Sequence, residues 1–211
     1  MTELTACPND VLLVIDVQQD FCAGGSLAVP DGDAVVPVIN QLADRFSHIV
    51  LTQDWHPAGH QSFASSHPGK APFETIDVPY GQQVLWPDHC VQGTFGAEFH
   101  PDLSIPRAEL VLRKGYNRQI DSYSAFFEND RKTPTGLGGY LKERGFGRVF
   151  LAGLALDFCV RFSAEDAYKL EFEVVVIEDA CRAIDTDGSL DETRRSLAAL
   201  GIKCIESGSL G

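Results

Sequence analysis

The chain has 211 residues, of which 44% are hydrophobic, and this is enough for one domain with a full core. Its formal charge of -13 argues against nucleic-acid and membrane partners, because phosphate binding needs clustered lysines and arginines. No apolar run reaches the roughly 18 residues of a membrane-spanning helix. Residues 1–7 lack the pattern of a secretory signal. We therefore expect a single domain over residues 1–211 of a cytoplasmic protein.

Apolar runs of strand length alternate along the chain with amphipathic segments of helical spacing. The expected strands are residues 11–15, 48–52, 109–113, 148–152, 173–177 and 202–205. The expected helices are residues 33–46, 135–144, 157–170 and 187–200. Asp33 is expected to cap the first helix, and Gly145 and Gly201 to follow the second and fourth. The alternation predicts an α/β, Rossmann-like fold: a six-stranded, mostly parallel sheet flanked by helices on both faces.

Residues 54–106 interrupt this alternation. Six of the eleven prolines lie between Pro57 and Pro101, and five of the six histidines lie between His56 and His100. A loop of this length inside a compact domain is usually functional. We expect it to lie over one edge of the sheet and to carry metal and substrate contacts.

Three residues with reactive side chains follow predicted strands. Asp16 follows the first strand, Lys114 the third, and Cys159 lies in the turn after the fourth. Because parallel strands end at the same edge of a sheet, these side chains are expected to converge. Taken singly, each has an ordinary alternative: a turn-capping aspartate, a solvated lysine and an inert buried cysteine.

Together the three residues form a set suited to attack on an amide carbonyl. Cys159 is the expected nucleophile, and the N-terminus of the following helix favours its thiolate form. Lys114 would stabilise that thiolate, while Asp16 would accept and return the proton. The backbone N–H groups of Ala155 and Cys159 are expected to form the oxyanion hole.

A second group of residues has the composition of a metal site. Asp54 and His56 are two residues apart after the second strand, and His60 and His89 follow in the long loop. Aspartate and imidazole suit Zn²⁺, Mn²⁺ or Fe²⁺, and two or three protein ligands leave positions open for substrate. The alternative is that these are loop histidines bonded to backbone or water.

Aromatic residues lie close in sequence to both groups. Phe21, Trp86, Tyr123 and Phe158 are adjacent to the candidate catalytic and metal-binding residues. A flat heteroaromatic substrate would stack among such rings, although ordinary core packing would also explain them.

Five ordered blocks of the chain resemble nicotinamidases of the isochorismatase-like cysteine hydrolase superfamily. The blocks are residues 15–27, 52–60, 86–94, 113–126 and 153–160. The resemblance implies an isochorismatase-like hydrolase fold and a triad of Asp16, Lys114 and Cys159, with Cys159 forming a thioester with the substrate. It also implies a cis peptide bond between Leu154 and Ala155.

The resemblance implies one divalent metal ion, zinc first, with iron or manganese as alternatives. Asp54, His56 and His89 would hold it, and it would bind the ring nitrogen of the substrate. His60 matches a further ligand that only some members use, so its role stays open. The residues implied to line the pocket are Phe21, Leu27, Trp86 and Tyr123. Phe158 replaces a residue that is often histidine.

The implied activity is hydrolysis of nicotinamide, and of pyrazinamide, to the acid and ammonia, in NAD salvage. The implied partner is a small-molecule substrate. One alternative is a related cysteine amidohydrolase acting on an N-carbamoyl or ureido compound. Another is a metal-stabilised binding domain without activity, in which Cys159 would be buried and unreactive. A homo-oligomer is compatible with the sequence, which does not specify the oligomeric state.

Overall fold

A six-stranded parallel sheet forms the centre of the molecule. The computed structural model describes residues 4–211, so residues 1–3 of the expected domain lie outside the described part. The strands are β1 (Asp10–Ile15), β2 (His48–Asp54), β5 (Leu110–Lys114), β6 (Arg148–Leu154), β7 (Glu173–Arg182) and β8 (Lys203–Ile205). Their order is β5-β2-β1-β6-β7-β8, and every neighbouring pair is parallel, which confirms the predicted sheet.

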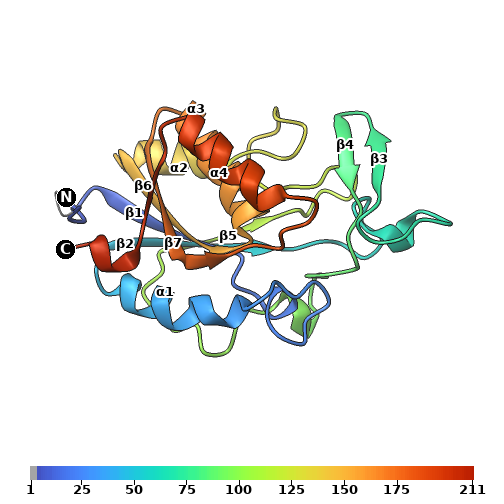
Figure 1. Ribbon diagram of the computed structural model, residues 1–211, viewed down its shortest axis with the longest axis horizontal. Coiled ribbons are helices and arrows are strands. Elements are labelled where there is room, and N and C mark those ends of the chain that lie inside the picture. The colour runs from blue at the N-terminus through green and yellow to red at the C-terminus, as the bar shows by residue number, and fades with distance from the viewer. Residues whose placement is uncertain (1–3) are drawn as a thin grey trace.

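Helices cover both faces of this sheet, as the alternation of elements predicts. They are α1 (Val35–Ala43), α2 (Leu137–Glu143), α3 (Arg161–Lys169) and α4 (Ser189–Ala199). Helix α1 lies on one face, and α2, α3 and α4 lie on the other (Figure 1). Among the described residues, none of the helices has the length and apolar character needed to cross a membrane.

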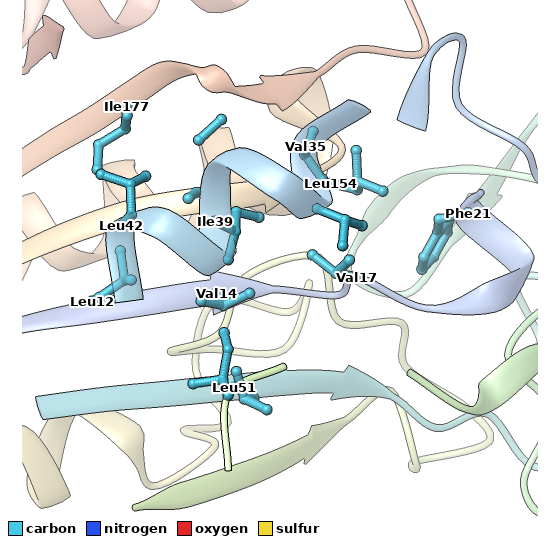
Figure 2. Packing of buried hydrophobic residues seen from close by; sticks show 14 of the residues in the cluster. Leu12, Val14, Val17, Phe21, Val35, Ile39, Leu42, Leu51, Leu154 and Ile177 are labelled. Carbon is cyan, nitrogen blue, oxygen red and sulfur yellow. The ribbon is translucent and has the colours of Figure 1, made fainter. Parts of the chain in front are cut away.

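Strand β1 is the centre of the core and is buried along its whole length. Since alternate residues of a strand point to opposite faces, Leu12 and Val14 pack towards α1, whereas Leu13 and Ile15 belong to the cluster on the other face. Figure 2 shows the first cluster, with Phe21 at one end of it. The core therefore extends along the sheet to the edge where the candidate site lies.

Several boundaries differ from those expected. Asp33 does not cap α1: its carboxylate accepts hydrogen bonds from the Ala23 N–H and His100 Nε2, and the helix begins two residues later. The helix expected at residue 157 begins as a wide π-helical turn, Leu156–Val160, before α3. Strand β7 continues to Arg182, five residues beyond the expected end, because a register shift lets it stay paired with β6.

The segment 54–106 contains a hairpin that the sequence did not predict. Strands β3 (Thr75–Val78) and β4 (Gly81–Val84) pair in antiparallel fashion, and the hairpin lies at the end of the molecule away from the two termini (Figure 1). The hairpin was missed because its two strands are short, four residues each, and largely polar.

Candidate active site

Three adjacent strands bring the charged residues of the site together. Asp16 follows β1, Asp54 ends β2 and Lys114 ends β5, and β2 lies between the other two strands. Lys114 therefore reaches past Asp54 towards Asp16. The expectation that parallel strands deliver these groups to one edge holds, and Asp54 is the residue that joins the two predicted groups.

The Lys114 ammonium is fully enclosed by oxygen atoms. Its Nζ lies 2.8 Å from Asp16 Oδ2, 2.9 Å from Asp54 Oδ1 and 2.8 Å from the Ser122 carbonyl oxygen. An ammonium has three hydrogens to donate, and here they go to Asp54 Oδ1, the Ser122 carbonyl oxygen and Cys159 Sγ, while Asp16 Oδ2 is an ion-pair contact. Burial opposes its charge, but Asp16 and Asp54 outweigh burial and raise the pKa of Lys114 well above its ordinary value. Lys114 is therefore a fixed cation.

Cys159 lies against this cation in the π-helical turn after β6. Its Sγ is 3.6 Å from Lys114 Nζ, and the residue is 7% exposed at the wall of a pocket that Ala155 also lines. The peptide bond between Leu154 and Ala155 is cis, as the family resemblance implies. The predicted triad therefore meets beside a pocket.

Burial and the neighbouring Lys114 act in opposite directions on the pKa of the Cys159 thiol. Burial raises the pKa of the thiol well above its ordinary value, and the carboxylates of Asp16 and Asp54 add to this, while Lys114 only partly opposes them. A thiol whose pKa is raised is a better nucleophile when a base takes its proton at the moment of attack.

Asp16 has an oxygen available for that proton. Its Oδ1 accepts a 2.6 Å hydrogen bond from the Thr52 hydroxyl. Its Oδ2 is in ion-pair contact with Lys114 but accepts no hydrogen bond of normal geometry from any residue in the described chain. Burial raises the pKa of Asp16 above 3.8, and Lys114 opposes this rise. A buried carboxylate with a free acceptor oxygen can serve as the proton shuttle.

Asp54, His56 and His89 form a buried group whose side chains can hold a divalent metal ion. Asp54 Oδ2 lies 3.1 Å from His56 Nε2 and 3.6 Å from His89 Nε2. The Nδ1 atom of His56 lies 2.9 Å from the Gly115 carbonyl, and that of His89 lies 2.8 Å from the Pro87 carbonyl. Each Nδ1–H thus donates to a carbonyl, which leaves both Nε2 lone pairs facing a carboxylate, an arrangement suited to a cation.

His60 is close to this group, but both of its ring nitrogens have hydrogen-bond partners in the protein. Its ring lies 4.4 Å from that of His56, centroid to centroid. Its Nε2 donates to the Asn117 carbonyl at 2.9 Å, and its Nδ1 lies 2.7 Å from the Ser62 hydroxyl. Both nitrogens have protein partners, so His60 supports the ring of His56 and is not oriented as a ligand.

The residues expected to line the pocket are brought together. Phe21, Leu27, Trp86 and Tyr123 line it with Asp54, His89 and Cys159. Phe158 also packs against these aromatic residues. Its ring centroid lies 4.9 Å from that of Trp86 and 5.6 Å from that of Tyr123, and the rings are nearly perpendicular. Trp86 Nε1 donates to the Tyr123 hydroxyl at 3.2 Å. The pocket is thus a narrow slot between aromatic edges and faces.

Sequence reasoning missed three residues of this site. Thr52 bonds Asp16, and its place as a polar residue near the end of a buried strand was a usable signal. Asp121 lines the pocket two residues before Tyr123, in one of the resembling blocks. Ile184 also lines the pocket, but no local pattern marks it, because the segment after β7 folds back over the site.

Comparison with known proteins agrees with this geometry. The isochorismatase domain matches residues 10–207. The nicotinamidase of Acinetobacter baylyi is 56% identical over 199 residues, which cover 94% of this chain and 93% of that protein. The solved structure of the Acinetobacter baumanii nicotinamidase/pyrazinamidase has the same 56% identity and a TM-score of 0.96, covering 97% of this chain and 99% of that one.

A more distant structure contains a metal. The pyrazinamidase of Pyrococcus horikoshii, solved in complex with zinc, is 32% identical with a TM-score of 0.77, and the match covers 94% of this chain and 99% of that chain. The matching domain spans nearly the whole chain, and the identities extend over almost the full length of each relative. The chain therefore belongs to the isochorismatase domain family, and within it to the group formed by the nicotinamidases.

Proposed function

We propose that this protein is an amidohydrolase that converts nicotinamide to nicotinate and ammonia, and that it also accepts pyrazinamide. The observation that carries the proposal is the position of Lys114, whose ammonium contacts Asp16 and Cys159 on one side and Asp54 of the metal group on the other. A sulfur nucleophile and a site for a heteroaromatic ring nitrogen thus share one pocket. The activity of the relatives supports the same substrate.

The first half of the reaction uses the triad. Asp16 Oδ2 takes the thiol proton as Cys159 Sγ forms a bond to the carboxamide carbon. The backbone N–H groups of Ala155 and Cys159 stabilise the oxyanion that results. The Asp16 carboxyl then gives its proton to the amide nitrogen, the carbon–nitrogen bond breaks, and ammonia leaves the thioester.

The second half returns the protein to its starting state. Asp16, again a carboxylate, takes a proton from water while the water oxygen attacks the thioester carbon. The carbon–sulfur bond breaks, Asp16 returns the proton to Cys159, and nicotinic acid leaves and ionises to nicotinate in water. Throughout, Lys114 keeps its charge and holds both carboxylates in place.

Asp54, His56 and His89 would hold one divalent ion, which we propose to be zinc. When bound, the ion would fix the pyridine nitrogen and so set the carboxamide against Cys159. The ligand types suit zinc, with iron or manganese as alternatives. The zinc complex of the archaeal pyrazinamidase supports this choice. Metal analysis of the purified protein tests it directly.

The substrate ring would lie between the aromatic side chains of the slot. Trp86 and Tyr123 would face the ring on one side, and Phe21 would contact it near His89, to which Phe21 is 5.5 Å distant by ring centroids. Burial between such faces is favourable for a flat heteroaromatic ring.

The deciding experiment measures ammonia release from nicotinamide by the wild-type protein and by Cys159→Ala. We expect the variant to lose about 10⁴-fold or more in kcat, because the nucleophile is absent. Cys7→Ala, at an exposed cysteine, is the control and should keep full activity. Equal rates in wild type and Cys159→Ala would refute the proposal.

A substrate comparison addresses the amidohydrolase alternative. Turnover of an N-carbamoyl compound that persists in the presence of chelator, without turnover of nicotinamide, would support a ureido substrate. The structure favours nicotinamide, because Asp54 and His89 of the metal group line the pocket, where a bound ion could contact a ring nitrogen.

We further propose that residues 1–211 form one domain and that the protein acts in the cytoplasm. The two core clusters share one sheet, with strands drawn from both halves of the chain, which supports a single domain. All six cysteines are free, which is typical of a reducing compartment.

A further inference from the structure

Asp121 is a buried carboxyl group that the proposed mechanism does not use. The residue is 2% exposed and lines the same pocket as Asp54, His89 and Cys159. It comes from the segment after β5, on the side of the pocket where Tyr123 also lies. Asp121 therefore belongs to the site, and the steps described above assign it no function.

Within residues 4–211, the partners of the Asp121 carboxylate are hydrogen-bond donors and not charged side chains. Its Oδ1 accepts a 2.8 Å bond from the Ser122 N–H, and its Oδ2 accepts a 2.9 Å bond from Gln83 Nε2. Within residues 4–211, Asp121 forms no ion pair with a lysine, an arginine or a histidine, whereas Asp16 and Asp54 both contact Lys114. A cation near a buried carboxylate stabilises it, and no lysine, arginine or histidine among residues 4–211 forms an ion pair with Asp121.

The metal group lies close enough to supply that cation. A carboxylate oxygen of Asp121 lies within 4.8 Å of ligand nitrogens of His56 and His60. His56 is also a member of the group with Asp54 and His89, whose ligand atoms are within the same distance of one another. Both ring nitrogens of His60 are held by Ser62 and Asn117, whereas Asp121 lines the pocket.

The count of buried charges points the same way. Asp16, Asp54 and Asp121 are the buried carboxyl groups at or beside the pocket, and Lys114, which contacts Asp16 and Asp54, is the buried ammonium there. Counted as carboxylates, these three groups exceed the one ammonium of the site by two negative charges, which one divalent ion would balance. Without Asp121 the excess would be one, and a divalent ion would leave the site positive.

We propose that Asp121 holds the water molecules on the open side of the metal ion, and so belongs to the metal site without being a direct ligand. Each of its oxygens already accepts one protein hydrogen bond and has a lone pair left for a metal-bound water. Carboxylates that orient bound water in this way tune metal affinity. The inference rests on the metal site of the proposed function.

The test is the Zn²⁺ dissociation constant of Asp121→Asn, measured by competition with a chromogenic chelator. We expect affinity to fall by about 10- to 100-fold, as for other residues that orient the ligands of a metal site. The matched control is Glu128→Gln, a buried carboxyl group in the same segment that does not line the pocket. Its zinc affinity should equal that of the wild type.

Unchanged zinc affinity in Asp121→Asn would overturn the inference while leaving the metal site intact. A wild-type protein that binds no zinc, iron or manganese would instead overturn the metal site, and this inference with it. Thermal unfolding of the metal-free proteins shows whether each variant is folded. If Asp121→Asn does not fold, Asp121→Ser, which leaves space for water, takes its place in the same competition and the same criteria apply.

Discussion

Lys114 contacts both the catalytic triad and the metal group. Its ammonium pairs with Asp16 of the triad and with Asp54 of the metal group, and it lies 3.6 Å from the Cys159 sulfur. A buried cation shared by two carboxylates stabilises both, and loss of one partner leaves uncompensated buried charge. Chemistry and metal binding are therefore coupled through one side chain.

Replacement of Lys114 by methionine should alter the titration of both partners. Lys114 lowers the pKa of Asp16 and that of Cys159, so its removal should raise both. The acid limb of kcat/KM, which reports the carboxylate form of Asp16 in the free enzyme, should move to higher pH. Alkylation of Cys159 by iodoacetamide at neutral pH should slow, because the thiolate fraction falls.

The control for this experiment is Lys132→Met at an exposed lysine, which should leave both measurements unchanged. Since the loss of a buried partner costs about 3–5 kcal/mol, the folded state of Lys114→Met is checked first by circular dichroism. An unshifted acid limb together with unchanged alkylation would show that Lys114 does not act on either group.

Asp157 links the π-helical turn Leu156–Val160 to a segment that lines the pocket. It lies in the π-helical turn that carries Cys159, is 1% exposed, and accepts hydrogen bonds from the Ile184 and Asp185 N–H groups and from the Ser189 hydroxyl. It thus ties the segment between β7 and α4 to the turn of the nucleophile. Ile184, which lines the pocket, is held in place by this contact.

Asp157→Ala should lower stability and loosen the pocket. A hydrogen bond to a charged group contributes about 1.5–3 kcal/mol, and three such bonds are lost, so urea unfolding should show a loss of at least about 2 kcal/mol. KM for nicotinamide should rise more than kcat falls, because Ile184 contacts substrate and not the reacting atoms. Asp191→Ala, at an exposed position of α4, is the control. Equal KM values for the two variants would contradict this role.

Strands β1 and β6 approach so closely that only glycine fits at one position. A Cβ added to Gly153 would lie 2.1 Å from the Ile15 carbonyl oxygen, and φ there is +123°. Gly153→Ala should therefore lose about 3 kcal/mol or more of unfolding free energy, or fail to fold. Gly139→Ala in α2 meets nothing within 4 Å and should gain about 0.4–1 kcal/mol. Similar urea midpoints for both variants would rule out this constraint.

For the molecule as a whole, the metal site joins segments that are distant in the chain. Asp54 belongs to β2, His89 to the long segment after it, and Lys114 to β5. A ligand that binds only the folded state stabilises the whole domain. Metal binding is thus expected to raise global stability as well as to bind substrate.

Metal removal should accordingly destabilise the protein. At a free Zn²⁺ concentration of about 100 times the dissociation constant, the unfolding free energy should exceed that of the metal-free protein by about 2.7 kcal/mol. Calorimetry with and without chelator measures this difference. His89→Ala should lack the response, whereas His67→Ala, outside the metal groups, should keep it. An identical melting temperature with and without zinc in the wild type would contradict the expectation.

The amino-acid sequence alone determined the alternation of strands and helices, the parallel sheet and the convergence of Asp16, Lys114 and Cys159. Hydrophobic periodicity is a local property, and parallel strands end at one edge whatever their order. Residue type and spacing also marked Asp54, His56, His60 and His89 as a metal-like group, and the resembling blocks selected Asp54, His56 and His89, which the structure brings together. These features depend on residues that are neighbours in the chain or that follow the carboxyl ends of parallel strands.

Only the tertiary structure decided the rest. Asp54 of the metal group contacts Lys114 of the triad because β2 lies between β1 and β5 in the sheet. The pKa of the Cys159 thiol is raised because packing removes it from water, an effect that no local pattern expresses. His60 is occupied by Asn117 and Ser62, while Asp121 faces the pocket. Burial and hydrogen-bond partners are properties of the folded chain, so neither could be read from residue order.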